Sequence, residues 1–234
     1  MGKIVNLDRT VIPACDVNTL EELEGLVKET ASVEKVGAYK IGFVLGLGFG
    51  LKETVAAIRK HSDKPIIYDH QKAGTDIPPM GEQFAKVCKE AGVDAIILFP
   101  QAGPETEKAW IKAAQDASLG VIVGGEMTHP AYLKGDNGFI CDDSPKRMYE
   151  TAIDAGVTDF VVPGNKPEKI AEYKAFFESK GIQPVMYSPG LVAQGGKITE
   201  SAKTAGDKWH AIVGRGIYKA EDKKKAAEEL TSQL

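Results

Sequence analysis

The sequence predicts an α/β protein folded as a single (β/α)8 TIM barrel, in which eight parallel strands alternate with eight helices. Short apolar, β-branched runs alternate with longer amphipathic segments from one end of the chain to the other. The chain has 234 residues, close to the roughly 250 that are typical of such a barrel. A doubly wound open sheet is the alternative, but eight strand–helix units in so short a chain favour a closed barrel over an open sheet.

Eight apolar runs are predicted to be strands. Their nearly continuous hydrophobicity is typical of parallel strands that are buried on both faces of the sheet. The predicted strands are residues 10–15, 36–41, 65–68, 95–99, 120–123, 159–162, 183–187 and 211–213.

An amphipathic segment follows each predicted strand. In the first of these segments Leu23 and Leu26 share one helical face, and Asn18 is the predicted N-cap. Glycines such as Gly92 and Gly156 mark the ends of several segments. The predicted helices are residues 20–30, 50–61, 81–91, 104–116, 144–155, 167–180, 198–205 and 220–234, and the glycines at 46, 48 and 50 are predicted to lie in a loop.

The composition indicates a globular protein, with 43% hydrophobic and 26% charged residues. A net charge of -4 gives no indication of a nucleic-acid or membrane partner. The three cysteines show neither disulfide nor zinc spacing, and no apolar run approaches the roughly 20 residues that span a bilayer. We therefore expect a cytoplasmic protein with one catalytic domain over residues 1–234.

Charged side chains gather where the first three predicted strands end. Active sites of these barrels lie at the C-terminal ends of the strands, and Asp16, Lys40 and Asp69 stand there. The segment Y-D-H-Q-K-A-G-T-D-I-P, residues 68–78, adds Lys72 and Asp76. A lysine between carboxylates stays protonated and is held in place, which suits a proton donor. A solvated network of salt bridges on the rim is the alternative.

Two glycine-containing loops near the end of the chain predict a phosphate site. The loop S-P-G-L-V-A-Q-G-G, residues 188–196, contains Pro189 and Gln194, and the eighth strand is followed by Gly214 and Arg215. Glycine lets backbone N–H groups approach an oxyanion, and arginine adds a charge that can bind it in bidentate fashion. In these barrels the phosphate site commonly involves the loops after strands seven and eight.

Several motifs in this order resemble the orotidine 5′-phosphate decarboxylase family, particularly its archaeal form, over nearly the whole chain. The matching pieces are A-C-D (14–16), Y-K-I-G (39–42), the D…K…D-I-P segment, E-M-T-H-P (126–130), S-P-G-L-V-A-Q-G-G and I-V-G-R-G-I-Y. The resemblance implies decarboxylation of orotidine 5′-monophosphate to uridine 5′-monophosphate without metal or cofactor. This reaction is the last step of de novo pyrimidine biosynthesis.

The resemblance also implies roles for individual residues. Lys40 and Asp69 would join Lys72 and Asp76 in a charged network at the reaction centre. Lys72 would protonate the C6 carbanion left by carbon dioxide, and Asp76 would reach the partner's site in a homodimer. Asp16 would contact the ribose or base, Thr128 would hydrogen-bond the pyrimidine, and Gln194 and Arg215 would hold the phosphate. The full substrate-binding set is Asp16, Thr128, Pro189, Gln194, Gly214 and Arg215.

The sequence departs from the family pattern in two places. The family spacing is D-x-K-x-x-D, whereas Asp69, Lys72 and Asp76 are spaced D-x-x-K-x-x-x-D. Residues three apart on a regular strand point to opposite faces, so convergence of the three groups requires a bulge or another loop path. His70 is a possible alternative occupant of one position. Thr128 replaces the usual serine but keeps the hydroxyl group.

Two other functions remain open. The related magnesium-dependent hexulose-phosphate synthases and ketogulonate-phosphate decarboxylases place a carboxylate at the end of the second strand, because Mg²⁺ needs oxygen ligands. This chain has Lys40 there, which favours the metal-free reaction. A non-catalytic barrel that binds a phosphorylated ligand would keep Gln194 and Arg215 but should have lost part of the set Asp69, Lys72 and Asp76.

Overall fold

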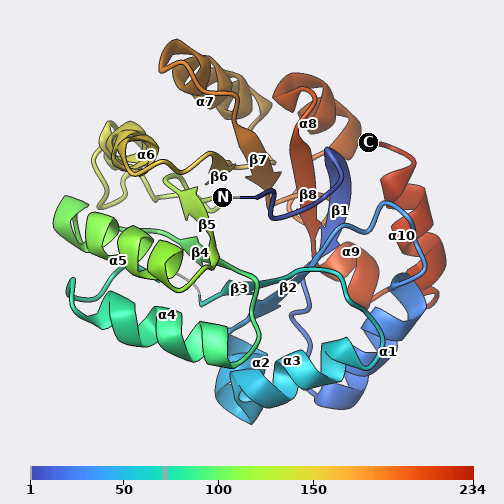
Figure 1. Ribbon diagram of the computed structural model, residues 1–234. Coiled ribbons are helices and arrows are strands. Elements are labelled where there is room, and N and C mark those ends of the chain that lie inside the picture. Colours follow the sequence, from blue (N-terminus) through green and yellow to red (C-terminus); the bar gives the residue numbers. More distant parts are fainter. Residues whose placement is uncertain (1, 71–72) are drawn as a thin grey trace.

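The computed structural model describes residues 2–70 and 73–234. Lys72 of the predicted site lies outside the described residues. The predicted barrel is confirmed: eight parallel strands form one sheet, in the order β1-β8-β7-β6-β5-β4-β3-β2. The helices surround the sheet on its outer side (Figure 1).

The strands have the predicted order along the chain, with ends that differ by a few residues. They are β1 (Arg9–Pro13), β2 (Tyr39–Gly42), β3 (Ile66–Asp69), β4 (Ala95–Leu98), β5 (Gly120–Gly124), β6 (Asp159–Val161), β7 (Val185–Ser188) and β8 (Trp209–Val213). Between β1 and β2 the sheet closes through the single bridges Val11–Val36 and Ala14–Lys40. The amide of Cys15 also donates to the carbonyl of Lys40 at 2.8 Å.

The helices follow the predicted alternation, with one additional short helix after β2 and another after β8. They are α1 (Leu20–Thr30), α2 (Phe43–Phe49), α3 (Leu51–Arg59), α4 (Met80–Glu90), α5 (Pro104–Asp116), α6 (Ser144–Asp154), α7 (Pro167–Ser179), α8 (Ile198–Ala205), α9 (Arg215–Tyr218) and α10 (Lys223–Thr231). The irregular stretch before α6 contains one short 3-10 turn, Lys134–Asp136. It lies between β5 and α6.

The prediction of a loop after β2 was wrong. Helix α2 begins directly after β2 and includes Gly46 and Gly48, although glycine weakens helices by about 1 kcal/mol. The close approach of β3 explains one of these glycines, because a Cβ at Gly46 would lie 3.1 Å from the Tyr68 hydroxyl. Gly50, with φ 82°, then separates α2 from α3.

The predicted N-cap of α1 was also wrong by one residue. The cap is Thr19, whose Oγ1 accepts a hydrogen bond from the Glu22 amide at 3.1 Å. The Glu22 carboxylate in turn accepts from the amides of Asn18 and Thr19, at 2.8 and 3.3 Å. This reciprocal pair is a capping box, in which the cap residue and the glutamate three positions later each accept a hydrogen bond from the other's backbone.

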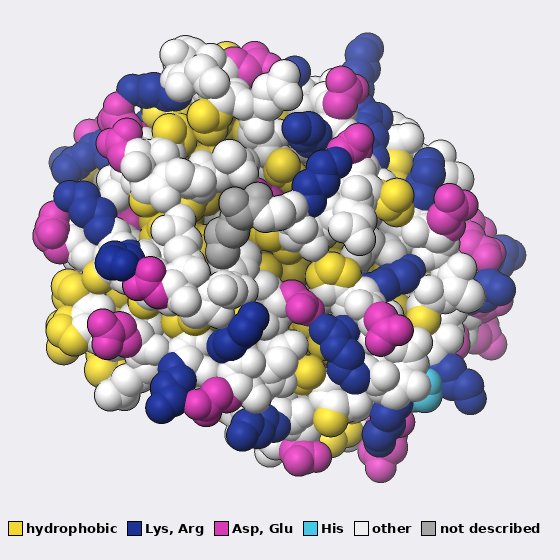
Figure 2. Space-filling model, in the orientation of Figure 1, with side chains coloured by type: hydrophobic (Ala, Val, Ile, Leu, Met, Phe, Trp, Pro, Cys, Tyr) yellow, Lys and Arg dark blue, Asp and Glu magenta, His cyan; other side chains and the backbone are white. Residues whose placement is uncertain are grey.

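The barrel interior is filled by side chains rather than open. Inward-facing residues from successive strands, including Ile12, Ile67, Ile122 and Ile212, form a cluster separate from the larger core between strands and helices. Since the interior is packed, a ligand can enter only above it, at the strand ends. The face near the N-terminus carries interspersed charges of both signs (Figure 2). Within the described part of the chain, no helix is long and apolar enough to cross a bilayer.

His210 lies near the N-terminal end of β8. Its Nδ1 is 2.8 Å from the Thr10 hydroxyl, and burial lowers the pKa of the imidazole to about 4. The imidazole is therefore neutral at pH 7, and it packs inside the N-terminal end of the barrel.

A buried carboxyl group in α5 makes stability depend on pH. Glu107 is 1% exposed, and its Oε1 has no hydrogen-bond partner. Burial raises the pKa of Glu107 from 4.5 to about 8. The unfolded chain therefore loses this proton first, and the free energy of unfolding should fall as pH rises through that interval and level off above it. At about 1.4 kcal/mol per pKa unit, the loss is of the order of several kcal/mol.

Urea unfolding of the native protein and of Glu107→Gln, at about pH 5, 6.5 and 8, checks this prediction. The variant should lose the downward slope because its amide does not titrate. Equal slopes for the two proteins would show that another group is responsible.

Candidate active site

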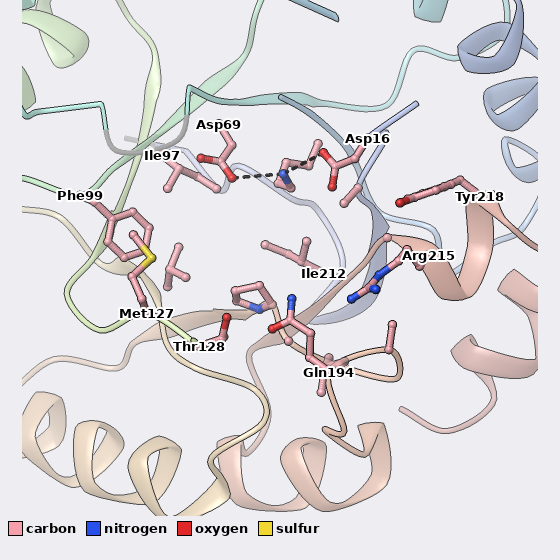
Figure 3. A pocket seen from close by; sticks show the side chains of 18 of the residues that line it. Asp16, Asp69, Ile97, Phe99, Met127, Thr128, Gln194, Ile212, Arg215 and Tyr218 are labelled. Atoms are coloured by element: carbon pink, nitrogen blue, oxygen red, sulfur yellow. Dashed lines mark hydrogen bonds and ion pairs between the residues drawn. The ribbon is translucent and has the colours of Figure 1, made fainter. Parts of the chain in front are cut away.

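A cavity of about 290 Å³ lies at the C-terminal ends of the strands (Figure 3). Its volume is at the lower end of the range for small-molecule sites. Most of the predicted site residues line it, and they come from both the N-terminal and the C-terminal half of the chain. They are Asp16, Lys40, Asp69, Thr128, Pro189, Gln194, Gly214 and Arg215. Folding thus brings together side chains that are far apart in the sequence.

One end of the cavity holds a cation between two carboxylates. Lys40 projects from β2, is 5% exposed, and its Nζ lies 3.1 Å from Asp69 Oδ2 and 3.7 Å from Asp16 Oδ1. Figure 3 shows the two carboxylates on either side of this amine. Burial alone would lower the pKa of Lys40, but Asp69 and Asp16 outweigh burial and raise it. Lys40 is therefore a permanent positive charge.

Two polar side chains face the other end of the cavity. Gln194 comes from the loop after β7, and Arg215 is the first residue of α9 (Figure 3). The β7 loop folds back on itself, with a hydrogen bond of 2.8 Å from the Val192 amide to the Gly196 carbonyl. Gly190 at φ 89° permits this turn, and a Cβ there would lie 2.8 Å from Thr128. The two loops form a shallow, positively charged rim suited to an anion.

Apolar side chains line the space between the two ends. Phe99, Met127 and Ile212 surround it, and Thr128 contributes a hydroxyl from the loop after β5 (Figure 3). The Asn165 amide nitrogen supports this loop by donating to the Thr128 carbonyl at 3.2 Å. A flat, partly polar ring would fit such a wall, with its hydrogen-bonding edge toward Thr128.

The sequence matches the family model described as "Orotidine 5'-phosphate decarboxylase / HUMPS family" over residues 9–230. The chain belongs to this family. The family resemblance inferred from the motifs is therefore confirmed.

Archaeal members of this family match the chain over nearly its full length. The orotidine 5′-phosphate decarboxylase of Methanosarcina mazei is 32% identical over 224 residues, which is 96% of this chain and 94% of that protein. The crystal structure of the Methanocaldococcus jannaschii enzyme, complexed with inhibitor BMP, has a TM-score of 0.84 and 29% identity, over 97% of this chain and 98% of that one. The enzyme of Sulfolobus solfataricus, at 18% identity and a TM-score of 0.73, supports the fold alone, over 95% of this chain and 96% of that one.

Asp76 does not line the cavity of its own chain. Its side chain is exposed, and Oδ1 accepts a hydrogen bond from the Ile77 amide at 2.7 Å. Within a single chain, Asp76 therefore lies apart from the cavity that Asp69 and Lys40 line. Lys72 lies outside the described residues, so its place relative to these groups stays a prediction.

His70 does not occupy a position in the charged network. Its Nδ1 hydrogen-bonds the Tyr68 hydroxyl, and its ring packs edge-on against Phe84 of α4, with centroids 5.9 Å apart. Residues that alternate along a strand point to opposite faces. Asp69 faces the cavity, and His70, one residue further, faces the helices.

Several cavity residues escaped the sequence reasoning. Ile97, Phe99 and Ile212 lie on or next to strands that are mostly apolar, so nothing distinguished these inward-facing side chains from their apolar neighbours. Glu126 had a stronger signal, as an acid directly after β5. It is 2% exposed and paired with Lys166 at 2.8 Å, which indicates a structural anchor for the loop that bears Thr128.

Proposed function

We propose that this protein is an orotidine 5′-phosphate decarboxylase that converts orotidine 5′-monophosphate to uridine 5′-monophosphate. The observation that carries the proposal is the division of one cavity into two charged ends, with Lys40 between Asp16 and Asp69 at one end and Arg215 with Gln194 at the other. An apolar wall that includes the Thr128 hydroxyl connects them. A nucleotide with a phosphate at one end and a carboxylated ring at the other matches this order.

The proposed reaction breaks one C–C bond and moves one proton. The bond between C6 and the carboxylate breaks, carbon dioxide leaves, and the electron pair remains on C6. The Lys72 ammonium then donates a proton to C6. Asp69, beside the substrate carboxylate, would disfavour the bound carboxylate more than the transition state, in which that charge has begun to leave. Contacts to the distant phosphate would provide binding energy that stabilises the transition state.

The position of Lys40 supports a reaction without a metal ion. Mg²⁺ prefers a shell of oxygen ligands, and the magnesium-dependent relatives need a carboxylate at the end of the second strand. Here an ammonium group occupies that place and pairs with both nearby carboxylates. Within residues 2–70 and 73–234, no group of three or more His, Cys, Asp or Glu side chains is arranged to hold a metal.

A homodimer is part of the proposal. Asp76 is exposed outside its own cavity, and the neighbouring Ile77 is 61% exposed, which is unusual for an isoleucine. We propose that this segment packs against a second copy, so that Asp76 completes the partner's charged network. Sedimentation of the native protein should give a dimer.

The decisive experiment follows the ultraviolet absorbance of the orotate ring after purified protein is added to orotidine 5′-monophosphate with EDTA. We expect the absorbance to fall at an unchanged rate in the presence of the chelator. Turnover of a sugar phosphate with Mg²⁺, and none of the nucleotide with EDTA, would favour the magnesium-dependent branch. Tight nucleotide binding without turnover would indicate a binding protein.

A further inference from the structure

The segment that leads from Asp69 to Asp76 is longer than the family pattern. Asp76 stands seven positions after Asp69, two more than in the family spacing D-x-K-x-x-D. The position of the Asp76 carboxylate therefore depends on what holds residues 73–77. Residues at the end of β4 and in the first turns of α5, which belong to the neighbouring unit, contact this segment.

The beginning of the segment is attached to the end of β4. The Phe99 amide donates a hydrogen bond of 2.8 Å to the Ala73 carbonyl. Gly74 follows at φ 92°, and a Cβ at this position would lie 3.2 Å from Pro100 Cα. The backbone thus turns tightly over Pro100, at a point where a side chain would be both strained and crowded.

The end of the segment is held by two buried donors from α5. Thr106 Oγ1 donates to the Asp76 carbonyl at 2.9 Å, and Trp110 Nε1 donates to the Ile77 carbonyl at 3.2 Å. The two side chains are 4% and 6% exposed. Neither lines the cavity, so neither can contact a ligand bound there.

The Trp110 ring is itself held in place. It lies against Phe84 with ring centroids 5.0 Å apart, and Phe84 stacks in turn on Tyr68 of β3, at 6.1 Å. A Cβ at Gly81 would lie 2.9 Å from the indole, so α4 approaches the ring as closely as glycine permits. The indole N–H therefore has little freedom to follow the carbonyl if the segment moves.

We propose that Thr106 and Trp110 are positioning residues, which fix the carbonyl groups of Asp76 and Ile77 and thereby aim the Asp76 carboxylate. This inference rests on the proposed function, because it assumes that Asp76 takes part in decarboxylation in the partner subunit. The two donors hold only carbonyl groups, and they leave the Asp76 carboxylate available. Their effect on catalysis should pass entirely through Asp76.

A double-mutant cycle tests this dependence. Thr106→Val keeps the shape of the side chain and removes the donor, and Trp110→Phe removes the indole N–H while keeping an aromatic ring. Each should lower kcat/KM about 10-fold, since small misplacements of catalytic groups can cost up to about 100-fold. In an Asp76→Asn background, the same substitutions should change kcat/KM by less than about twofold.

Two further variants separate positioning from general stability. Thr106→Ser keeps the hydroxyl and should restore most of the activity that Thr106→Val loses. Thr231→Val removes a comparable buried hydroxyl, which donates to the Glu228 carbonyl at 3.0 Å in α10, and should leave kcat/KM unchanged. Thermal melting of each variant confirms that the measured protein is folded.

The outcomes distinguish the two proposals. If the native protein does not decarboxylate the nucleotide, the proposed function fails, whatever the variants do. If the native protein is active, unchanged activity in both Thr106→Val and Trp110→Phe overturns the positioning role. Equal losses in the native and Asp76→Asn backgrounds overturn it as well, because the effect would then not pass through Asp76. Should Thr106→Val fail to fold, Trp110→Phe tests the same dependence alone.

Discussion

Replacing Lys72 by alanine is expected to lower kcat by roughly 10²–10⁴-fold, the usual contribution of a positioned general acid. The departure of carbon dioxide leaves an electron pair on C6, and a nearby ammonium group both stabilises this charge and supplies the proton. Lys40 is the one lysine among the described residues that line the cavity, and it already pairs with Asp69 and Asp16. Lys40 should therefore not replace Lys72 as the donor.

Affinity for uridine 5′-monophosphate separates chemistry from binding in this variant. The product has no carboxylate to lose, so Lys72→Ala should bind it within a few-fold of the native affinity while kcat falls. Lys86→Ala, on the exposed face of α4, is the matched control and should keep native activity. If Lys72→Ala retained kcat and Lys40→Met lost it in a folded protein, the proton donor would have to be reassigned to Lys40.

Replacing Arg215 by alanine is expected to lower kcat/KM by roughly 10- to 100-fold. A hydrogen bond to a charged group contributes about 1.5–3 kcal/mol, and the exposure of Arg215 places the effect in the lower part of that range. The neutral donor Gln194 should contribute less, about fivefold, when it is replaced by alanine. The loss in Arg215→Ala should shrink as salt is added, because the arginine is exposed and its charge is screened.

Binding of uridine and of its 5′-monophosphate shows whether these side chains hold the phosphate. Arg215→Ala should weaken the affinity for the nucleotide and leave the affinity for the nucleoside unchanged. Equal weakening for the two ligands would show that Arg215 supports the shape of the cavity instead. Arg59→Ala controls for the loss of a surface arginine, because it removes a pair with Asp94, 2.7 Å away, at the N-terminal ends of β3 and β4, opposite the cavity.

The sequence predicted the polar part of the site better than its apolar part. Asp16, Lys40 and Asp69 stood out because charged residues are rare beside buried strands, and the C-terminal strand ends meet at one rim. Phe99 and Ile212 carried no such signal, since their neighbours along a strand buried on both faces are mostly apolar as well. Which of its side chains face the cavity depends on the register between strands, and one sequence does not reveal that register.

The alternating pattern by itself determined the order of strands and helices, and with it the barrel. Parallel strands need crossover helices, and eight such units in a short chain favour a closed barrel over a doubly wound open sheet. The same pattern determined which polar residues share the rim. These conclusions follow from local chemistry, in which each element is specified by its own residues.

Only the tertiary structure decided how distant segments hold one another. Helix α2 forms despite Gly46 and Gly48, Lys40 lies between two carboxylates from other strands, and residues of α5 hold the Asp76–Ile77 peptide. His70 points toward the helices, where it hydrogen-bonds the Tyr68 hydroxyl and packs against the Phe84 ring. Each of these results comes from contacts between residues far apart in sequence, where packing and charge pairing outweigh local preference.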